Sequence, residues 1–224
     1  MVKVSAIVSA YYAEEYLDGR LKNLAAQKPR PEIVVVCQEG SAEERIAREN
    51  GADIVFTTTD IPTVYAAWNM GIEKATGEYI TNANSDDRLY PGALAAMALV
   101  LDKGSNAVAY TDIDIVDEIG GAPVGRYQWK EGGLAELLEG CFLGPMPMWK
   151  KSLHLKYGYF DATLHSAGDY EFWLRLAKGG EKFFHIRQPM GAYLNRNDSV
   201  EHRESLRGVI ETARARTKYG GNWL

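Results

Sequence analysis

The first half of the chain alternates short apolar runs with longer amphipathic runs. Apolar runs rich in β-branched residues, typical of strands, occupy residues 3–9, 32–37, 53–58, 78–83 and 106–113. The stretches between them, residues 14–27, 42–50, 63–75 and 91–102, have the spacing of helices. Regular alternation of strand and helix predicts an α/β protein with a mostly parallel sheet covered by helices on both faces. The near-continuous Val and Ile content fits strands buried on both sides.

The second half has shorter, mixed elements. We expect helices near 133–139 and 166–178, strands at 182–186 and 191–195, and a final basic helix over 201–218, with an apolar, proline-containing run at 142–149. Neither an internal repeat nor a linker is visible. We therefore predict a single domain over 1–224, in which residues 1–112 and 113–200 form two walls of one cleft and residues 201–224 form a C-terminal helix.

Composition narrows the classes of partner. With 25 Lys and Arg against 30 Asp and Glu, the formal charge is −5, so nucleic acid is not expected as a partner. Cys37 and Cys141 lie in apolar runs, which predicts two reduced core thiols and a cytoplasmic setting. No apolar run reaches the roughly 18–20 residues of a membrane helix, and a signal peptide is not apparent. The basic helix over 201–218 fits either a solvated face or peripheral contact with an anionic membrane or polyanionic acceptor.

Polar and aromatic clusters follow three of the predicted strands. These clusters are residues 9–12 (SAYY), 38–41 (QEGS) and 84–87 (NSDD). In open sheets of this kind, ligands bind outside the carboxyl ends of the strands. The sequence has neither a P-loop nor a dinucleotide-binding glycine motif, so any phosphate must be bound in another way.

Two of these residues, Asp86 and Asp87, are adjacent acids at the end of a strand. Carboxylate oxygens suit Mg²⁺ or Mn²⁺, which take one or two carboxylates and leave positions for substrate phosphates. An Asp-Asp pair before a helix also suits an N-terminal cap. The local sequence leaves both interpretations open.

Another acidic cluster, Asp169 and Glu171, begins the amphipathic helix predicted over 166–178. The helix dipole keeps a carboxylate in the first turn ionised, which is the useful state for a general base. Trp173 and Leu176 behind it fit a helix face that packs into the core. Asp169 is the residue of this cluster that we do not assign to structure.

Four segments, taken in order, closely resemble the family 2 glycosyltransferases of GT-A fold. The segments are SAIVSAYYAEEYL (5–17), VVVCQEGS (34–41), AAWNMGIEKATGEYITNANSDDRL (66–89) and FDATLHSAGDYEFWLRLA (160–177). The resemblance covers roughly residues 3–200, and the ordered set is more specific than any one motif. It implies a Rossmann-like GT-A domain that transfers a sugar from a nucleotide sugar to an acceptor hydroxyl with inversion, assisted by Mn²⁺ or Mg²⁺.

The resemblance also assigns roles to residues. It makes Asp169 the general base and Asp86 a metal ligand, and it places His202 in a C-terminal segment that closes over the donor and offers a metal ligand. A single histidine is otherwise more often structural. Glu39 would accept a hydrogen bond from the nucleotide base. The positions implied to contact the donor are Ala10, Tyr11, Glu39, Asn69, Asn84 and Ser85.

Several positions depart from the family pattern. Asn84 stands where the first acid of an Asp-x-Asp element is usual, and Gln38 replaces the first of a common acidic pair, while Ala13 stands near a usual asparagine. Because an amide at position 84 adds no charge to the metal site, either the affinity for the metal is reduced or Asp86, with or without Asp87, binds the metal. Trp68 replaces a common arginine and either stacks on the donor or packs in the core.

The resemblance implies a UDP-, dTDP- or GDP-sugar donor and a glycan or lipid-linked acceptor, in surface polysaccharide or glycoconjugate synthesis. One alternative is a sugar-nucleotide binding or scaffold domain that has lost catalysis, which the departures at Asn84 and Gln38 suggest. The other is a nucleotidyltransferase, although residues 9–16 (SAYYAEEY) contain no glycine for an activating loop.

Overall fold

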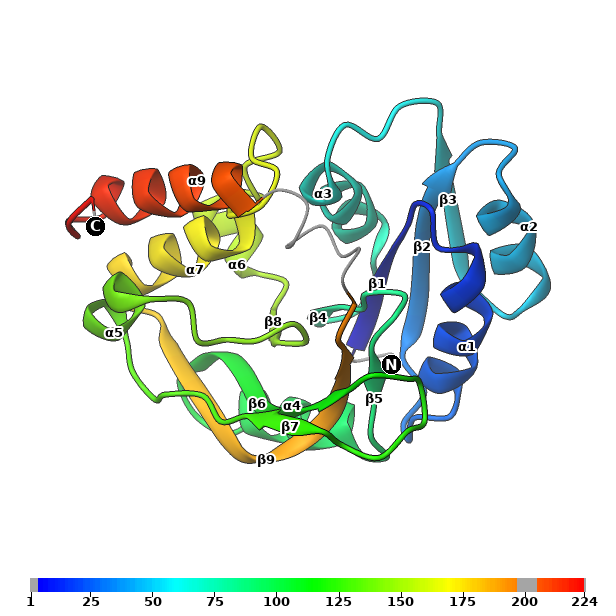
Figure 1. Ribbon diagram of the computed structural model, residues 1–224, viewed down its shortest axis with the longest axis horizontal. Coiled ribbons are helices and arrows are strands. Elements are labelled where there is room, and N and C mark those ends of the chain that lie inside the picture. The colour runs from blue at the N-terminus through cyan, green and yellow to red at the C-terminus, as the bar shows by residue number, and fades with distance from the viewer. Residues whose placement is uncertain (1–3, 197–204, 224) are drawn as a thin grey trace.

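A computed structural model describes residues 4–196 and 205–223. Its strands are β1 (Val4–Ala10), β2 (Glu32–Gln38), β3 (Ile54–Thr58), β4 (Tyr79–Asn82), β5 (Arg88–Leu89), β6 (Asn106–Val116), β7 (Gly125–Tyr127), β8 (Met148–Lys150) and β9 (Lys182–Leu194). Its helices are α1 (Glu14–Ala25), α2 (Ala42–Glu49), α3 (Val64–Lys74), α4 (Ala93–Asp102), α5 (Leu134–Glu139), α6 (Leu153–Tyr157), α7 (Gly168–Lys178) and α9 (Ser205–Lys218). Figure 1 shows their arrangement.

The strands form one mixed sheet in the order β3-β2-β1-β4-β8-β6-β9-β5, with β7 paired to β6. The first four run parallel, as the alternating pattern predicts, and β1 lies between β2 and β4. β8 then pairs antiparallel with both β4 and β6. The predicted α/β class is confirmed, and the carboxyl ends of β1, β2 and β4 meet at one edge.

The second half differs from prediction in its last strands. The two strands expected at 182–186 and 191–195 are one long strand, β9, which runs parallel to β6. The register shifts between Thr111 and Asp112, where Pro189 pairs with Asp112. Proline lacks a backbone donor and is tolerated in a strand at such an irregularity, so it bends β9 without ending it. Of the basic helix predicted over 201–218, α9 begins at Ser205, and residues 201–204 lie outside the described part.

Two apolar cores cover the two faces of the sheet. Along β1, Ala6 and Val8 face the core formed with α1, α2 and α4, whereas Ile7 faces the core formed with α3, α5, α6 and α7. This alternation follows from the period of two in a strand. Figure 1 shows β6, β7 and β9 curling beneath α7, along which α9 lies.

The two cysteines are unpaired, as predicted, but only one belongs to the core. Cys37 is buried on β2, whereas Cys141 is exposed in the segment after α5, so the expectation of two core thiols is wrong for Cys141. An apolar run in the sequence did not distinguish a buried strand from a loop. Within residues 4–196 and 205–223, none of the helices has the length and apolar character needed to cross a membrane.

The buried His154 should make the fold sensitive to acid. It is 5% exposed, accepts the Trp149 indole N–H at 2.8 Å, and stacks on Phe172. Burial lowers its pKa to about 4, below the ordinary value of 6.5. As the pH falls, this histidine binds a proton in the unfolded protein near pH 6.5 but in the folded protein only near pH 4. The free energy of unfolding therefore falls between these two pH values, by roughly 3 kcal/mol for this group.

Urea unfolding at neutral pH and near pH 4.5 checks this expectation with His154→Gln. The variant should be less stable at neutral pH but should lose less stability on acidification than the wild type. His165→Gln, which exchanges a less buried histidine, serves as the control. A His154→Gln protein with the full wild-type dependence on pH would contradict the assignment.

Candidate active site

The loops after β1 and β2 present aromatic and acidic side chains at the same edge of the sheet. Tyr11 is 49% exposed and Tyr12 is 86% exposed, with their ring centroids 4.3 Å apart. Tyr12 has a φ of 52°, a left-handed conformation that is costly for a residue other than glycine. Glu39 is exposed, and its backbone N–H donates to Thr58. Ala10 is 1% exposed, so its methyl group packs in the core, and a contact with a ligand would involve its backbone.

The acidic segment after β4 is a hydrogen-bonded loop and not a helix cap. α4 begins only at Ala93, its N-cap is Gly92, and no side chain of the described residues caps it. The capping interpretation of the two acids is therefore wrong. Asp87 is 1% exposed and accepts a hydrogen bond from the Asn84 amide at 3.1 Å, while Asp86 remains partly exposed.

The burial of Asp87 gives a physical reason for Asn84. Burial, reinforced by the charge of Asp86, raises the pKa of Asp87 to about 7. A third acid at position 84 would add repulsion to an already crowded site, whereas an amide donates a hydrogen bond to it. Ser85 contributes its carbonyl, which accepts from the Arg88 guanidinium at 2.8 Å.

A buried arginine lies close to these acids. Arg20 on α1 is 0% exposed, and its Nη1 donates to Asn23 at 3.0 Å. Burial lowers its pKa to about 10, against the opposing attraction of Asp87. At neutral pH it therefore remains a cation that partly offsets the acidic loop. The sequence held a signal for it, because Arg20 shares the buried face of α1 with Leu17 and Leu21.

Asp86 forms an ion pair with Arg196, whose Nη2 lies 2.8 Å from Oδ2. The Arg196 guanidinium also lies over the ring of Tyr16, 4.7 Å from its centroid. Within the described residues, no group of three or more metal-binding side chains exists. One partly exposed carboxylate beside a buried one fits a Mg²⁺ or Mn²⁺ ion shared with substrate phosphates, and does not fit a metal cage built from protein alone. His202 lies outside the described residues.

Asp169 is fixed at the start of α7 by two hydrogen bonds to Oδ1. The Tyr65 hydroxyl donates from 3.1 Å and the backbone N–H of Tyr170 from 2.8 Å. Tyr65 comes from α3, in the first half of the chain, and is 3% exposed. Burial, with the charge of Asp169, holds the pKa of Tyr65 well above its ordinary value, so its hydroxyl stays a donor. A Cβ at Gly168 would lie 2.7 Å from the Tyr65 ring, so only glycine permits this approach.

The loop before α7 is held by a carboxylate from the C-terminal helix. Glu211 on α9 is 7% exposed and accepts hydrogen bonds from three successive backbone N–H groups, those of His165, Ser166 and Ala167, at 2.8 to 3.1 Å. α7 has no side-chain cap from its own N-cap residue, Ala167. Glu211 therefore holds the backbone that leads into α7, including the N–H of the N-cap residue itself, although it does not replace an N-cap side chain.

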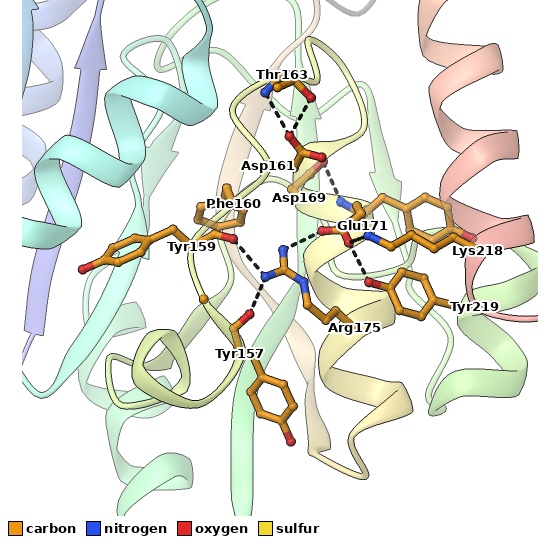
Figure 2. Close-up of polar contacts among 12 residues, drawn as sticks. Tyr157, Tyr159, Phe160, Asp161, Thr163, Asp169, Glu171, Arg175, Lys218 and Tyr219 are labelled. Carbon is orange, nitrogen blue, oxygen red and sulfur yellow. Dashed lines mark hydrogen bonds and ion pairs between the residues drawn. The ribbon is translucent and has the colours of Figure 1, made fainter.

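Glu171 joins the same two helices two residues beyond Asp169, as Figure 2 shows. It is 3% exposed and accepts hydrogen bonds from Arg175 at 2.6 Å, Lys218 at 2.8 Å and Tyr219 at 2.6 Å. Burial alone would raise the pKa of Glu171, but the hydrogen bonds from these three donors have the larger effect and lower it. Glu171 is thus a structural anion between α7 and α9. Asp169 does not belong to this group of hydrogen bonds among Glu171, Arg175, Lys218 and Tyr219.

Asn69 and Trp68 on α3 contribute to the structure. The Asn69 amide donates to the Phe160 carbonyl at 2.9 Å and accepts from the Phe160 N–H at 3.1 Å. Trp68 is 6% exposed and packs edge-on against Tyr65 and Phe160. Trp68 therefore packs in the core, and a donor role of Asn69 stays a prediction.

Curated bacterial proteins resemble the chain in sequence. The uncharacterized glycosyltransferase RT0329 of Rickettsia typhi is 24% identical over 196 residues, which cover 81% of this chain and 60% of that protein. The amylovoran biosynthesis glycosyltransferase AmsB of Erwinia amylovora is 24% identical over 86% of this chain and 69% of that protein. The chain thus spans less than two thirds of the length of RT0329 and slightly more than two thirds of that of AmsB.

Solved structures share the fold. S. aureus TarS 1–349 in complex with UDP superposes with a TM-score of 0.76 at 21% identity, over 97% of this chain and 65% of that one. The mannosyltransferase PcManGT from Pyrobaculum calidifontis, in complex with GDP-Man and Mn²⁺, gives 0.71 at 18% identity, over 96% of this chain and 63% of that one. The fold is the GT-A fold of these glycosyltransferases.

The family description Glycosyl transferase family 2 matches residues 5–166. The match contains the strand ends at Tyr11, Glu39 and Asp86, and it stops three residues before Asp169. Because it covers most of the chain and agrees with the fold and with the order of the motifs, the chain belongs to the glycosyl transferase family 2.

Proposed function

We propose that the protein transfers a sugar from a nucleoside diphosphate sugar to an acceptor hydroxyl, with inversion at the anomeric carbon. The observation that carries the proposal is the placement of Asp169. Its carboxylate is anchored through one oxygen by Tyr65 and Tyr170, at the start of a helix that Glu211 holds in place. Such a fixed, partly exposed carboxylate in a family 2 chain suits a general base.

The proposed donor site is the edge formed by the ends of β1, β2 and β4. Tyr11 offers an exposed ring to the nucleoside, and Glu39 offers an exposed carboxylate that accepts an N–H from uracil, thymine or guanine. The UDP complex of TarS and the GDP-Man complex of PcManGT support a uridine or guanosine donor. Asn84 and Ser85 follow β4 at the same edge, where the diphosphate is proposed to bind.

A divalent metal is proposed at Asp86, where Mg²⁺ or Mn²⁺ would stabilise the departing diphosphate as a Lewis acid. Arg196 is paired with this carboxylate and would have to share or release it when the metal binds. The cation Arg20 limits the negative charge that accumulates around Asp87.

In the proposed reaction, Asp169 accepts the proton of the acceptor hydroxyl as that oxygen attacks the anomeric carbon. The new glycosidic bond forms on the face opposite to the bond that breaks, and the nucleoside diphosphate leaves with the electron pair. One displacement requires one base, in contrast with the two carboxylates of a glycosidase. The hydrogen bonds from Tyr65 and Tyr170 keep the carboxylate oriented while it receives the proton.

The acceptor is proposed to be a glycan or a lipid-linked sugar in polysaccharide or glycoconjugate synthesis. The relative AmsB, named for amylovoran biosynthesis, supports a polysaccharide. Exposed Leu206 and Val209 beside the exposed Arg207 and Arg214 on α9 support peripheral contact with an anionic membrane. A cytoplasmic location agrees with this proposal.

Thermal unfolding with UDP, GDP, dTDP and CMP, each with and without Mn²⁺, tests the donor site. A ligand that binds only the folded state raises the apparent stability by mass action. Release of nucleoside diphosphate from the matching nucleotide sugar then tests turnover, with free sugar or an acceptor glycan as the second product. Binding of a nucleotide without turnover on any acceptor would favour a scaffold function over transfer.

Replacing Asp86 by alanine should remove the dependence on metal. Because one partly exposed carboxylate suits a metal shared with phosphates, Mn²⁺ should stabilise the wild type in the presence of nucleoside diphosphate far more than it does alone. Asp86→Ala should lose most of that extra stabilisation and lower turnover by at least about tenfold. Asp18→Ala, which removes an exposed acid paired with Lys22 on α1, is the matched control. Unchanged Mn²⁺ affinity in Asp86→Ala would exclude this metal site.

A further inference from the structure

A cavity lies on the β6–β9 half of the sheet, where the proposed reaction does not use it. Its volume is about 300 Å³, and it is lined by Asp112, Gln128, Trp129, Glu131, His185 and Arg187. This volume is at the lower end of the roughly 300–1,000 Å³ typical of small-molecule sites. One small polar unit would fit.

The wall formed by residues 128–131 is fixed to the sheet. The backbone N–H of Trp129 donates to the Asp112 carboxylate at 3.2 Å, and the Tyr110 hydroxyl donates to the backbone carbonyl of Lys130 at 2.7 Å. The ring of His185 stacks on Tyr110 at 4.8 Å between centroids. The cavity is therefore bounded by a strand pair and a pinned loop, so its polar groups are preorganised for a ligand.

A histidine in this cavity lacks one of its hydrogen bonds. The side chain of His185 is 4% exposed, and its Nε2 lies 2.8 Å from Asp112. Nδ1 is buried without a hydrogen-bond partner among the described residues, and the nearest acid, Glu131, is 3.9 Å away. A buried polar atom without a partner is costly, so a ligand hydroxyl that bonds to Nδ1 would satisfy it.

The charged side chains of the cavity already have hydrogen-bond partners. Asp112 lies against His185, and Glu131 accepts two hydrogen bonds from Arg187, at 2.8 and 2.9 Å. An anionic ligand would meet two carboxylates against one guanidinium. A cationic ligand would have to displace Arg187 from Glu131, or the donors that already bond to Asp112, so a neutral ligand is favoured. A neutral sugar presents alternating hydroxyl and C–H groups. Its hydroxyls could donate to the carboxylates and accept from the guanidinium and the Gln128 amide, and its C–H groups could pack on the Trp129 ring.

The segment that follows α5 packs against one side of this cavity. Cys141 lies in this segment, and desolvation, with a smaller contribution from the Asp169 carboxylate, raises the pKa of its thiol. Three residues along the chain, Gly144 packs so closely on Trp129 that an added Cβ would lie 2.9 Å from its Nε1. Trp129 then lines the cavity.

We propose that the cavity between β6, β9 and residues 128–131 is an acceptor subsite that binds a neutral sugar unit remote from the attacking hydroxyl. The proposal rests on the proposed glycosyl transfer and adds a substrate class, namely an acceptor of more than one sugar that extends from Asp169 past residues 141–144 to the cavity. A monosaccharide acceptor would reach Asp169 but not the cavity.

Binding of short neutral oligosaccharides, measured by saturation-transfer NMR and tryptophan fluorescence, tests the subsite. The probes are linear oligomers of neutral hexoses and N-acetylhexosamines, with uronic acid oligomers of equal length for comparison. The double variant Gln128→Ala and Arg187→Ala changes exposed groups of the lining and should weaken binding of the neutral oligomer by about tenfold or more. Lys130→Ala, on the same loop but outside the lining, should bind as the wild type does.

Nucleotide binding by the same preparations separates this proposal from the proposed function. Failure of the wild type to bind any neutral oligomer, or equal binding by the double variant, would overturn the subsite even where nucleotide sugars are bound and turned over. Absence of nucleotide binding and turnover beside intact oligomer binding would instead overturn glycosyl transfer, and with it the acceptor role of the cavity. Preference for the uronic acid oligomers would also contradict the subsite as described.

Discussion

The variant Asp169→Asn is expected to lose most turnover while it retains the fold and nucleotide binding. General base catalysis contributes roughly 10²–10⁴-fold, so kcat should fall by about that factor. Asparagine keeps the shape of the side chain and an oxygen that accepts from Tyr65 and from the Tyr170 N–H, which Asp169 does now. What is lost is the capacity to take a proton.

Single-turnover release of nucleoside diphosphate, with binding measured separately by thermal shift, distinguishes the two effects. Asp161→Asn is the matched control, because Asp161 lies in the loop shortly before α7 and bonds only to Thr163 among the hydrogen-bond partners drawn in Figure 2. It should retain near wild-type turnover. If Asp169→Asn also retained it, the assignment of the base would be wrong.

The fold of the first half could be predicted from the sequence because its elements are locally encoded. β1 and β2 are near-continuous β-branched runs, and the intervening α1 has a helical apolar period. β9 was harder, because Pro189 divides it in sequence and only pairing with β6 makes it one strand. The three residues of β8 become a strand only because β4 and β6 lie on either side.

In the candidate site too, some features follow from the local sequence and others only from the folded structure. Asp86 and Asp169 stand at a strand end and a helix start, positions that local patterns identify. The groups that fix them come from distant parts of the chain. Tyr65 is 104 residues from Asp169, and Arg196 reaches Asp86 from the end of β9. No spacing rule connects such pairs, so the burial of Asp87 and its bond to Asn84 became visible only in three dimensions.

Glu211→Ala should impair catalysis although Glu211 touches neither the proposed donor site nor Asp169. Removing its carboxylate leaves three backbone N–H groups before α7 without their acceptor, at a cost of roughly 1–3 kcal/mol in stability. The start of α7 then loses its fixed position, and with it the placement of Asp169. We expect kcat to fall by about ten- to a hundredfold with little change in the KM for donor, because small misplacements of a reacting group are costly.

The matched control for this positioning role is Glu171→Gln, which weakens the other buried contact between α7 and α9 without touching the residues before α7. It should lower stability yet spare kcat, whereas Glu211→Gln, which keeps one acceptor oxygen, should partly restore the activity that alanine loses. In an Asp169→Asn background, Glu211→Ala should add little further loss, because a residue that acts through the base has nothing left to position. Additive losses in kcat would instead mean that Glu211 acts on the reaction independently of Asp169.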